Sequence, residues 1–341
     1  MSAPAASTKS LGPRIGAVNS RLILLLLALL AVFGLLLGER LFSAASLRSM
    51  AYQLPELGIL SLAMMVPLLS GGLDLAIVAT ANLTALTIAF LFEAMVPPVP
   101  GLAWVAAQVA AVAAGLALAA VIGAVNGVII AYLEVSPILT TLGAMTLIKG
   151  ISIGLTHGGV LSNFPSLVVF IGNGSAIGVP VVVLIFIAVA ASMALILNRT
   201  PFGQILHMLG SNEAATRYSG IDTRRMLVKV YVASSLLAAI GGFVMMARFN
   251  SANAAYGESY LLVTILAAVL GGVSPSGGFG KVVGLVFALV ILQLISTAFN
   301  LMNFSQFLTL AIWGGTLIAV AAVARLRDYV RLPWRLPGKF P

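Results

Sequence analysis

Long uncharged apolar stretches alternate with short polar segments along almost the whole chain. Two of these stretches run from Leu22 to Gly38 and from Val179 to Leu197. A helix needs about 20 apolar residues to cross the hydrocarbon layer of a membrane, because it rises about 1.5 Å per residue. The pattern therefore predicts an all-α, polytopic integral membrane protein.

Charged residues and clusters of Pro or Gly mark the ends of the spans, since irregular backbone in lipid lacks hydrogen-bond partners. The predicted spans are 21–38, 50–69, 74–94, 103–125, 138–157, 179–198, 227–247, 259–273, 282–300 and 305–324. Two uncharged runs exceed one span, and we divide them at Pro97–Pro100 and at Asn300–Ser305. The count is ten transmembrane helices, and eight or nine remain alternatives.

The first apolar run imitates a secretory signal peptide, because Arg21 precedes it and small residues follow. Glu39 and Arg40 come directly after the run, which is poor context for cleavage. We therefore expect a retained first span behind an N-terminal cytoplasmic tail, 1–20, and a transmembrane permease domain over 21–324.

Composition adds the orientation. The chain is 61% hydrophobic and 8% charged, with a net charge of +9 and no cysteine. With the N-terminus inside, the outer segments hold Arg40, Arg48 and Arg248, Lys149 lies within a span, and every other Lys or Arg between Lys9 and Lys339 is placed inside. Basic residues mark the cytoplasmic side, so both termini are predicted to be cytoplasmic, with a basic tail over 325–341. We attribute the charge to orientation at membrane lipid and expect no nucleic-acid partner.

The loop over about 199–226 contains the polar stretch GSNEAATRYSG. Ser211 or Asn212 can cap a helix, Glu213 and Arg217 favour its two ends, and Gly220 can adopt the left-handed cap. The stretch predicts a helix of two turns, after which Asp222 caps the next span. A short surface helix between spans exceeds what a connection needs, so its exposed face is available to a soluble partner.

Catalytic and nucleotide-binding motifs fail on inspection. Gly150–Gly154 reads Gly-x-Ser-x-Gly but lies in a predicted span, where no nucleophile elbow forms. The segment ending at Lys281 has Pro275 where a P-loop needs Gly, and Val282 where it needs Ser or Thr. His157 and His207 fall on opposite sides of the membrane, which argues against a metal site. The sequence thus predicts no catalytic, cofactor-binding or metal-binding residue.

Polar residues within predicted spans are the candidates for the pathway or its gating, because such groups are costly in lipid. They are Asp74, Asn82, Asn126 and Asn300. Asp74 follows a glycine pair and can cap the next span, with gating or proton transfer as the alternative. Asn82 and Asn126 can equally form interhelical hydrogen bonds. Lys149 can snorkel to the interface.

Several motifs together resemble a known family. The stretches Ser70–Leu75, Gly123–Gly127, Pro137–Met145, Thr200–Gly203, Gly210–Ala215, Ser219–Ile221 and Leu270–Gly278 are similar, in order and spacing, to the permease subunits of ribose-type ABC sugar importers. The similarity runs from about Pro55 to Val323.

The resemblance implies a bacterial inner-membrane permease, paired with a second permease subunit as a homo- or heterodimer. It also implies a cytoplasmic ABC ATPase, which binds ATP and Mg²⁺, and an extracytoplasmic sugar-binding protein. In that family the loop here is the coupling helix that docks on the ATPase; its residues are Gly210, Ser211, Asn212, Glu213, Ala214, Ala215, Arg217 and Gly220.

One departure from the family concerns the solute. Ala76–Ala79 stand where small polar residues are usual, which implies a less hydroxylated solute or pairing with a more typical subunit. An ion-coupled secondary transporter using Asp74 or Lys149 is the alternative function. A membrane-embedded enzyme is the other class considered, and no catalytic residue set supports it.

Overall fold

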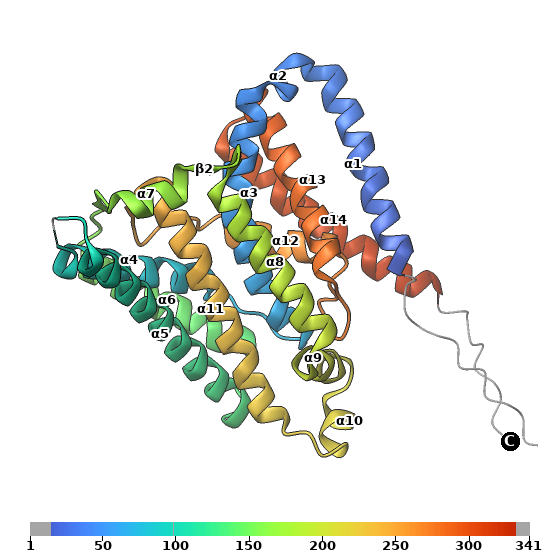
Figure 1. The fold of residues 1–341 in the computed structure, drawn as a ribbon. Coiled ribbons are helices and arrows are strands. Elements are labelled where there is room, and N and C mark those ends of the chain that lie inside the picture. The colour runs from blue at the N-terminus through green and yellow to red at the C-terminus, as the bar shows by residue number, and fades with distance from the viewer. Residues whose placement is uncertain (1–14, 98, 332–341) are drawn as a thin grey trace, which may run out of the picture.

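The computed structural model describes residues 15–97 and 99–331. Within this part the chain is helical apart from loops and two pairs of very short strands (Figure 1). The helices are α1 (Ile15–Leu37), α2 (Glu39–Phe42), α3 (Ala44–Leu69), α4 (Ile77–Met95), α5 (Leu102–Tyr132), α6 (Pro137–Thr156), α7 (Ser166–Asn173), α8 (Val181–Arg199), α9 (Pro201–Ser211), α10 (Glu213–Tyr218), α11 (Thr223–Phe249), α12 (Tyr260–Leu270), α13 (Val282–Leu301) and α14 (Gln306–Arg331). The strands are β1 (Leu161–Ser162), β2 (Ser175–Ala176), β3 (Val179–Pro180) and β4 (Ser251–Ala252), with β1 antiparallel to β4 and β2 to β3.

The all-α membrane fold is confirmed, and each predicted span contains a helix. Eight of the described helices are long and apolar enough to cross a membrane, judged by length and composition: α1, α3, α4, α5, α6, α8, α11 and α13. The helix in the predicted span 259–273 is shorter than expected, because α12 has 11 residues and is about 16 Å long. The apolar part of α14, Phe307–Ala319, is also short.

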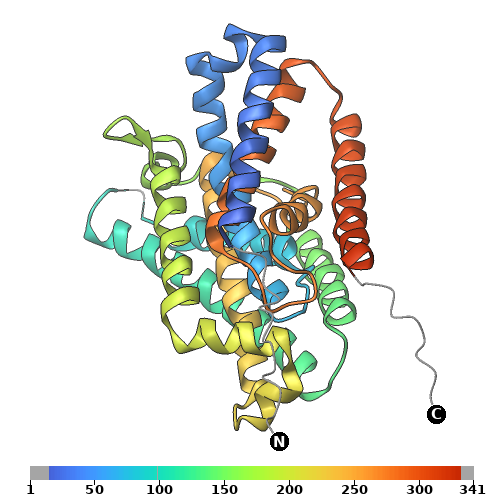
Figure 2. The same cartoon turned by 90° about the vertical axis from the view of Figure 1, so that its right-hand side faces the viewer.

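The predicted tails fall partly outside the described residues. Residues 1–14 and 332–341 are not among those described. Helix α1 begins at Ile15, before the predicted boundary at 20, and α14 continues to Arg331, beyond 324. The described ends of both helices point toward the end of the molecule that carries α10 (Figure 2).

Helices α3, α4 and α11 form the centre of the bundle and are mostly buried. Helix α5 packs along α11 through glycines on one face. A Cβ atom on Gly123 would lie 2.6 Å from the carbonyl oxygen of Tyr231, and one on Gly127 would lie 2.7 Å from Cα of Val228. The backbones of α5 and α11 therefore approach one another closely, as small residues allow in membrane bundles.

The outer helices expose large apolar side chains. Helix α1 stands at the edge of the bundle (Figure 1), and Leu35 on it is 89% exposed. Helices α5, α6 and α8 also present Leu, Ile and Val residues on their outer faces. Such surfaces would aggregate in water, so they are suited to lipid or to another membrane subunit.

Two glycine turns of the same geometry end α3 and α12. In the first, the N–H of Gly72 donates to the carbonyl of Pro67, and Gly71 has a φ of 84°. In the second, the N–H of Val273 donates to Ala268, and Gly272 has a φ of 85°. A positive φ suits glycine, because it has no Cβ atom to clash. Both are Schellman caps, as the predicted glycine turns require.

Candidate functional site

The turn that ends α3, the glycine-rich segment between α12 and α13, and the end of α9 meet at one end of the bundle. The N–H of Gly278 donates to the carbonyl of Leu69 at 2.9 Å. A Cβ atom on Gly210 would overlap that same carbonyl oxygen. A Cβ atom on Gly277 would lie 2.8 Å from both the carbonyl oxygen of Gly210 and the N–H of Gly71. Three segments far apart in sequence thus pack backbone against backbone, and we call this contact the glycine junction (Leu69–Gly72, Gly210, Ser276–Gly278).

Helix α9 attaches the loop to this junction. It is amphipathic, with Leu206 and Leu209 buried against the bundle. His207 on α9 lies with Nδ1 3.0 Å from the carbonyl oxygen of Gly278. A carbonyl oxygen only accepts, so Nδ1 carries the proton and donates. The sequence predicts a helical insert only from Gly210 onward, so most of α9 was not predicted.

Helix α10 is the predicted two-turn helix, with the predicted cap. The side chain of Asn212 accepts from the N–H of Ala215 at 3.0 Å, and Gly220 has a φ of 81°. Glu213 and Arg217 form an ion pair of 2.9 Å, one turn apart, and Thr223 donates to the same carboxylate. These local bonds hold a short helix that would otherwise be marginal in water.

Nearly the whole surface of α10 is exposed. Thr216 is its buried residue, while Ala214, Ala215 and the Glu213–Arg217 pair face outward. Tyr218 is 93% exposed, an unusual position for an aromatic side chain. Exposed tyrosine is typical of interface anchors. Tyr218 lies within the stretch GSNEAATRYSG, but it was not among the residues predicted to contact a partner.

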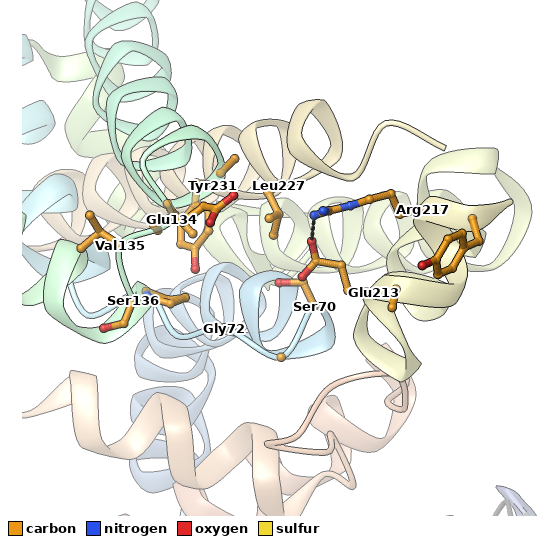
Figure 3. A pocket seen from close by; sticks show the side chains of 15 residues that line it. Ser70, Gly72, Glu134, Val135, Ser136, Glu213, Arg217, Leu227 and Tyr231 are labelled. Carbon is orange, nitrogen blue, oxygen red and sulfur yellow. Dashed lines mark hydrogen bonds and ion pairs between the residues drawn. The ribbon is translucent and has the colours of Figure 1, made fainter. Parts of the chain in front are cut away.

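A hollow of about 720 Å³ opens between α10, the first glycine turn and the connection from α5 to α6 (Figure 3). Glu213 and Arg217 line one side of it, and Glu134 lies on another (Figure 3). Arg224 on α11 pairs with Glu134 at 3.0 Å. Charged groups therefore lie on two sides of the hollow, between apolar residues such as Ile130 and Leu227, and we call the hollow the vestibule.

Asp74 lies beside the first glycine turn and is 1% exposed. Its carboxylate accepts from the hydroxyl of Ser234 at 2.8 Å and from the N–H of Ala76 at 3.0 Å. Ala76 is the residue before α4, so this bond closes a turn ahead of the helix. The side chain of Asp74 therefore does not cap α4, as the sequence predicts it can. Its bond to Ser234 ties the turn to α11.

The predicted pathway asparagines do not come together. Asn82 is buried on α4, and its Nδ2 donates to the carbonyls of Ala254 and Tyr256 at 3.0 and 2.8 Å. Asn126 is buried on α5 between the two glycines that contact α11, and its Nδ2 has no hydrogen-bond partner among the described residues. Asn300 is exposed near the end of α13. Asn82 therefore bonds a loop, whereas one prediction from the sequence was a hydrogen bond to another helix.

Two charge pairs were not anticipated. Lys149 on α6, a residue that can snorkel to the interface, pairs with Glu258 at 2.8 Å. Glu56 on α3 is 0% exposed and accepts two hydrogen bonds from the guanidinium of Arg248, of 2.7 and 2.8 Å. Tyr260 donates to Glu56 as well, at 2.6 Å. A lone Glu in an apolar run was the available signal, since buried carboxylates need partners.

The rejected catalytic motifs have ordinary structural roles. The hydroxyl of Ser152, within Gly150–Gly154, donates to the carbonyl of Ile148 inside α6. In the described part of the chain, His157 ends α6 and lies apart from His207 on α9, and no group of three or more His, Cys, Asp or Glu residues is placed to hold a metal ion.

Comparison with known proteins finds relatives that are all transport permeases. The sequence profile of the family described as "branched-chain amino acid transport system / permease component" matches residues 46–321. The chain is 34% identical to the ribose import permease of Escherichia coli K12 over 294 residues, 85% of this chain and 88% of the relative. It is 30% identical to the L-arabinose transport system permease of the same strain, over 80% of each chain.

A third relative is the fructose import permease of Rhizobium meliloti, which is 27% identical over 89% of this chain and 83% of the relative. No solved structure matches the chain.

Proposed function

The chain belongs to the family of branched-chain amino acid transport system permease components, and we propose that it is the membrane subunit of an ATP-driven importer for a sugar or sugar-like solute. It is a multi-pass permease of the bacterial inner membrane, in the sugar-importing group of ABC permeases. The proposal adds the partners and the roles of individual residues.

Helix α10 carries the proposal, because it is an exposed, internally stabilised helix attached to the ends of buried helices. An ABC ATPase docks on α10 and on the vestibule beside it. Closure of the ATPase displaces α9 and α10 together, since His207 and Gly210 join them to the glycine junction. The junction passes the displacement to the end of α3, in the bundle centre, and to the segment between α12 and α13.

The α10 end faces the cytoplasm in this proposal. Five basic residues lie at this end, at the end of α8, on α10 and at the start of α11: Arg199, Arg217, Arg224, Arg225 and Lys229. Three lie toward the other end, on α2, at the start of α3 and at the far end of α11: Arg40, Arg48 and Arg248. The greater number of basic residues at the α10 end supports this orientation.

The chain itself binds no nucleotide in this scheme. The glycine-rich segment before α13 uses the N–H of Gly278 to bond Leu69, and packs Gly277 against Gly210. These backbone contacts occupy the segment within the bundle, where a phosphate cradle needs free N–H groups. ATP and Mg²⁺ are therefore assigned to the partner ATPase.

Two further partners complete the complex. A second permease subunit covers apolar side chains exposed on α5 and α6, where Leu139 is 64% and Leu147 66% exposed. An extracytoplasmic sugar-binding protein delivers the solute at the end that carries α7. A less hydroxylated solute or a heteromeric pair is proposed from Ala76–Ala79.

Purification of the chain from its native membranes, followed by mass spectrometry of what accompanies it, tests the proposal. We expect a P-loop ATPase and a periplasmic binding protein, and ATP-dependent uptake after reconstitution. Recovery of the chain alone, in a detergent that keeps other ABC importers intact, contradicts the proposal. Uptake driven by a proton or sodium gradient without an ATPase would then favour ion-coupled transport.

A further inference from the structure

The backbone between α11 and α12 is irregular and reaches the interior of the bundle. β4 pairs with β1. The loop that follows β4 then passes beside α4, where the side chain of Asn82 donates to the carbonyls of Ala254 and Tyr256. Glu258 pairs with Lys149, which lies about 10 Å along α6 from its last residue, Thr156. Irregular backbone at such depth occurs where it is buried in protein or lines a water-filled space.

A cavity of about 200 Å³ lies beside this backbone. Its polar lining consists of Asn82, Lys149 and Glu258, from three different segments. Val78 and Ala79 of α4 and Met145 of α6 supply an apolar wall. The volume is well above the ~10–15 Å³ that a single water requires, so the space is large enough for a small solute.

The amide of Asn82 is fixed in orientation. Its Nδ2 donates to two carbonyl oxygens, and carbonyl oxygens cannot donate, so turning the amide over would lose both bonds. Its Oδ1 therefore remains an acceptor. Asn82 is 2% exposed, and Oδ1 has no hydrogen-bond partner among the described residues. A buried acceptor left unpaired is costly, and Oδ1 is closed off in this structure, so the amide of Asn82 serves to hold the loop that carries Glu258 beside the cavity.

The charges of the cavity indicate the class of solute. Lys149 and Glu258 are paired at 2.8 Å, so the lining has no net charge from them. A hydroxyl group can accept from the ammonium and donate to the carboxylate without breaking the pair. An ion would leave one of the two charges unmatched. The lining therefore suits an uncharged molecule with several hydroxyl groups and one less polar face.

We propose that this cavity is a contact site for an uncharged polyhydroxylated solute within the membrane, where Lys149 and Glu258 bind solute hydroxyls and Asn82 holds the backbone that carries Glu258. The inference rests on the proposed function and names the residues at which this permease would meet its solute. Ala79 and Val78, which stand where the resembled family has small polar residues, form the less polar face of the site.

Water access is the first test, because the chain has no cysteine of its own. Ala79→Cys on α4 places one thiol at the cavity. Ala85→Cys is the control on the same helix, since Ala85 is equally buried but does not line this cavity. We expect the neutral reagent 2-hydroxyethyl methanethiosulfonate to modify the first and not the second. In the complete complex, a transported sugar should slow the modification.

Uptake by proteoliposomes containing the complete importer is the second test, with D-ribose, L-arabinose and D-fructose as probes. Lys149→Met and Glu258→Gln change side chains that are 42% and 52% exposed, so the bundle should still fold. We expect each to lower the maximal uptake rate about tenfold, while ATP hydrolysis and recovery of the ATPase stay unchanged. Asn82→Leu should do the same, although it also releases the loop.

Ser192→Ala is the matched control, because its hydroxyl bonds within α8 to Ala188 and lies on an exposed face. Wild-type uptake by Lys149→Met and Glu258→Gln, or equal thiol reactivity at the two cysteine positions, overturns this inference alone. A wild-type complex that takes up L-leucine and none of the three sugars refutes the proposed function, and the solute class assigned to the cavity with it.

Discussion

The N–H of Gly278 donates a hydrogen bond of 2.9 Å to the carbonyl oxygen of Leu69, which joins the glycine-rich segment between α12 and α13 to the end of α3. Gly210, near the end of α9, packs against both residues. The end of α9, the end of a buried helix and a buried glycine-rich segment thus share one contact. Motion of α9 and α10 therefore has a direct mechanical route to α3 and to the segment that connects α12 with α13.

Gly210→Ala should disrupt this contact. The added Cβ would overlap the carbonyl oxygen of Leu69. Both groups belong to the backbone, so the overlap is relieved only if one of the two segments moves. We expect a loss of about 1–3 kcal/mol in the free energy of unfolding and a stronger loss of uptake. Gly150→Ala is the control, since a Cβ on that helical glycine meets nothing within 4 Å. Thermal unfolding of the purified variants measures the difference; equal midpoints would count against the junction.

Tyr218→Ala should weaken attachment of the ATPase without affecting the fold. Tyr218 is 93% exposed, so its removal costs little packing, while tyrosine anchors commonly contribute 2 kcal/mol or more to an interface. We expect reduced co-purification of the ATPase and unchanged thermal unfolding. Ile177→Ala, at an equally exposed position on the turn between β2 and β3, should leave ATPase recovery as in the wild type.

Glu213→Ala and Arg217→Ala should uncouple ATP hydrolysis from uptake. Their ion pair is exposed, so its contribution to stability is below about 1 kcal/mol, and a large effect on stability is not expected. Instead, α10 would transmit displacement poorly once its side-chain bonds are lost. The ratio of solute imported to ATP hydrolysed reports this, and a wild-type ratio in both variants argues against the coupling role.

Glu56→Gln should destabilise the bundle strongly. Arg248 is 17% exposed and would lose its matching charge, and removing one partner of a buried pair typically costs about 3–5 kcal/mol. The double variant Glu56→Gln with Arg248→Met should be less destabilised than the sum of the two single changes. Denaturation of the purified chain measures all three, and strict additivity would show that the pair does not interact.

The orientation can be read by labelling, because the natural chain has no cysteine. A membrane-impermeant maleimide should label Ile177→Cys in intact spheroplasts and Tyr218→Cys only after permeabilisation. The variants are expressed without the partner subunits, because an ATPase on α10 would cover position 218. Both positions are highly exposed in the chain, so access to the thiol then differs only by the side of the membrane. The reverse pattern would place α10 outside and remove the basis for an ATPase on it.

The sequence by itself determined the class of protein, the places of its membrane-length helices and the form of α10. These follow from local patterns: apolar runs of membrane length, and the capping residues Asn212, Gly220 and Asp222 acting within a few positions of themselves. Local bonds of this kind need no knowledge of the rest of the fold. The glycine turns after α3 and α12 were predictable for the same reason.

Only the tertiary structure decided what those turns contact and which charges find partners. Arg248 meets Glu56, Glu258 meets Lys149, and Asn82 meets the loop before α12, each across a long separation in the sequence. In a bundle surrounded by lipid, a buried polar group bonds the partner that helix packing brings close to it. The sequence does not show which distant residue that partner is.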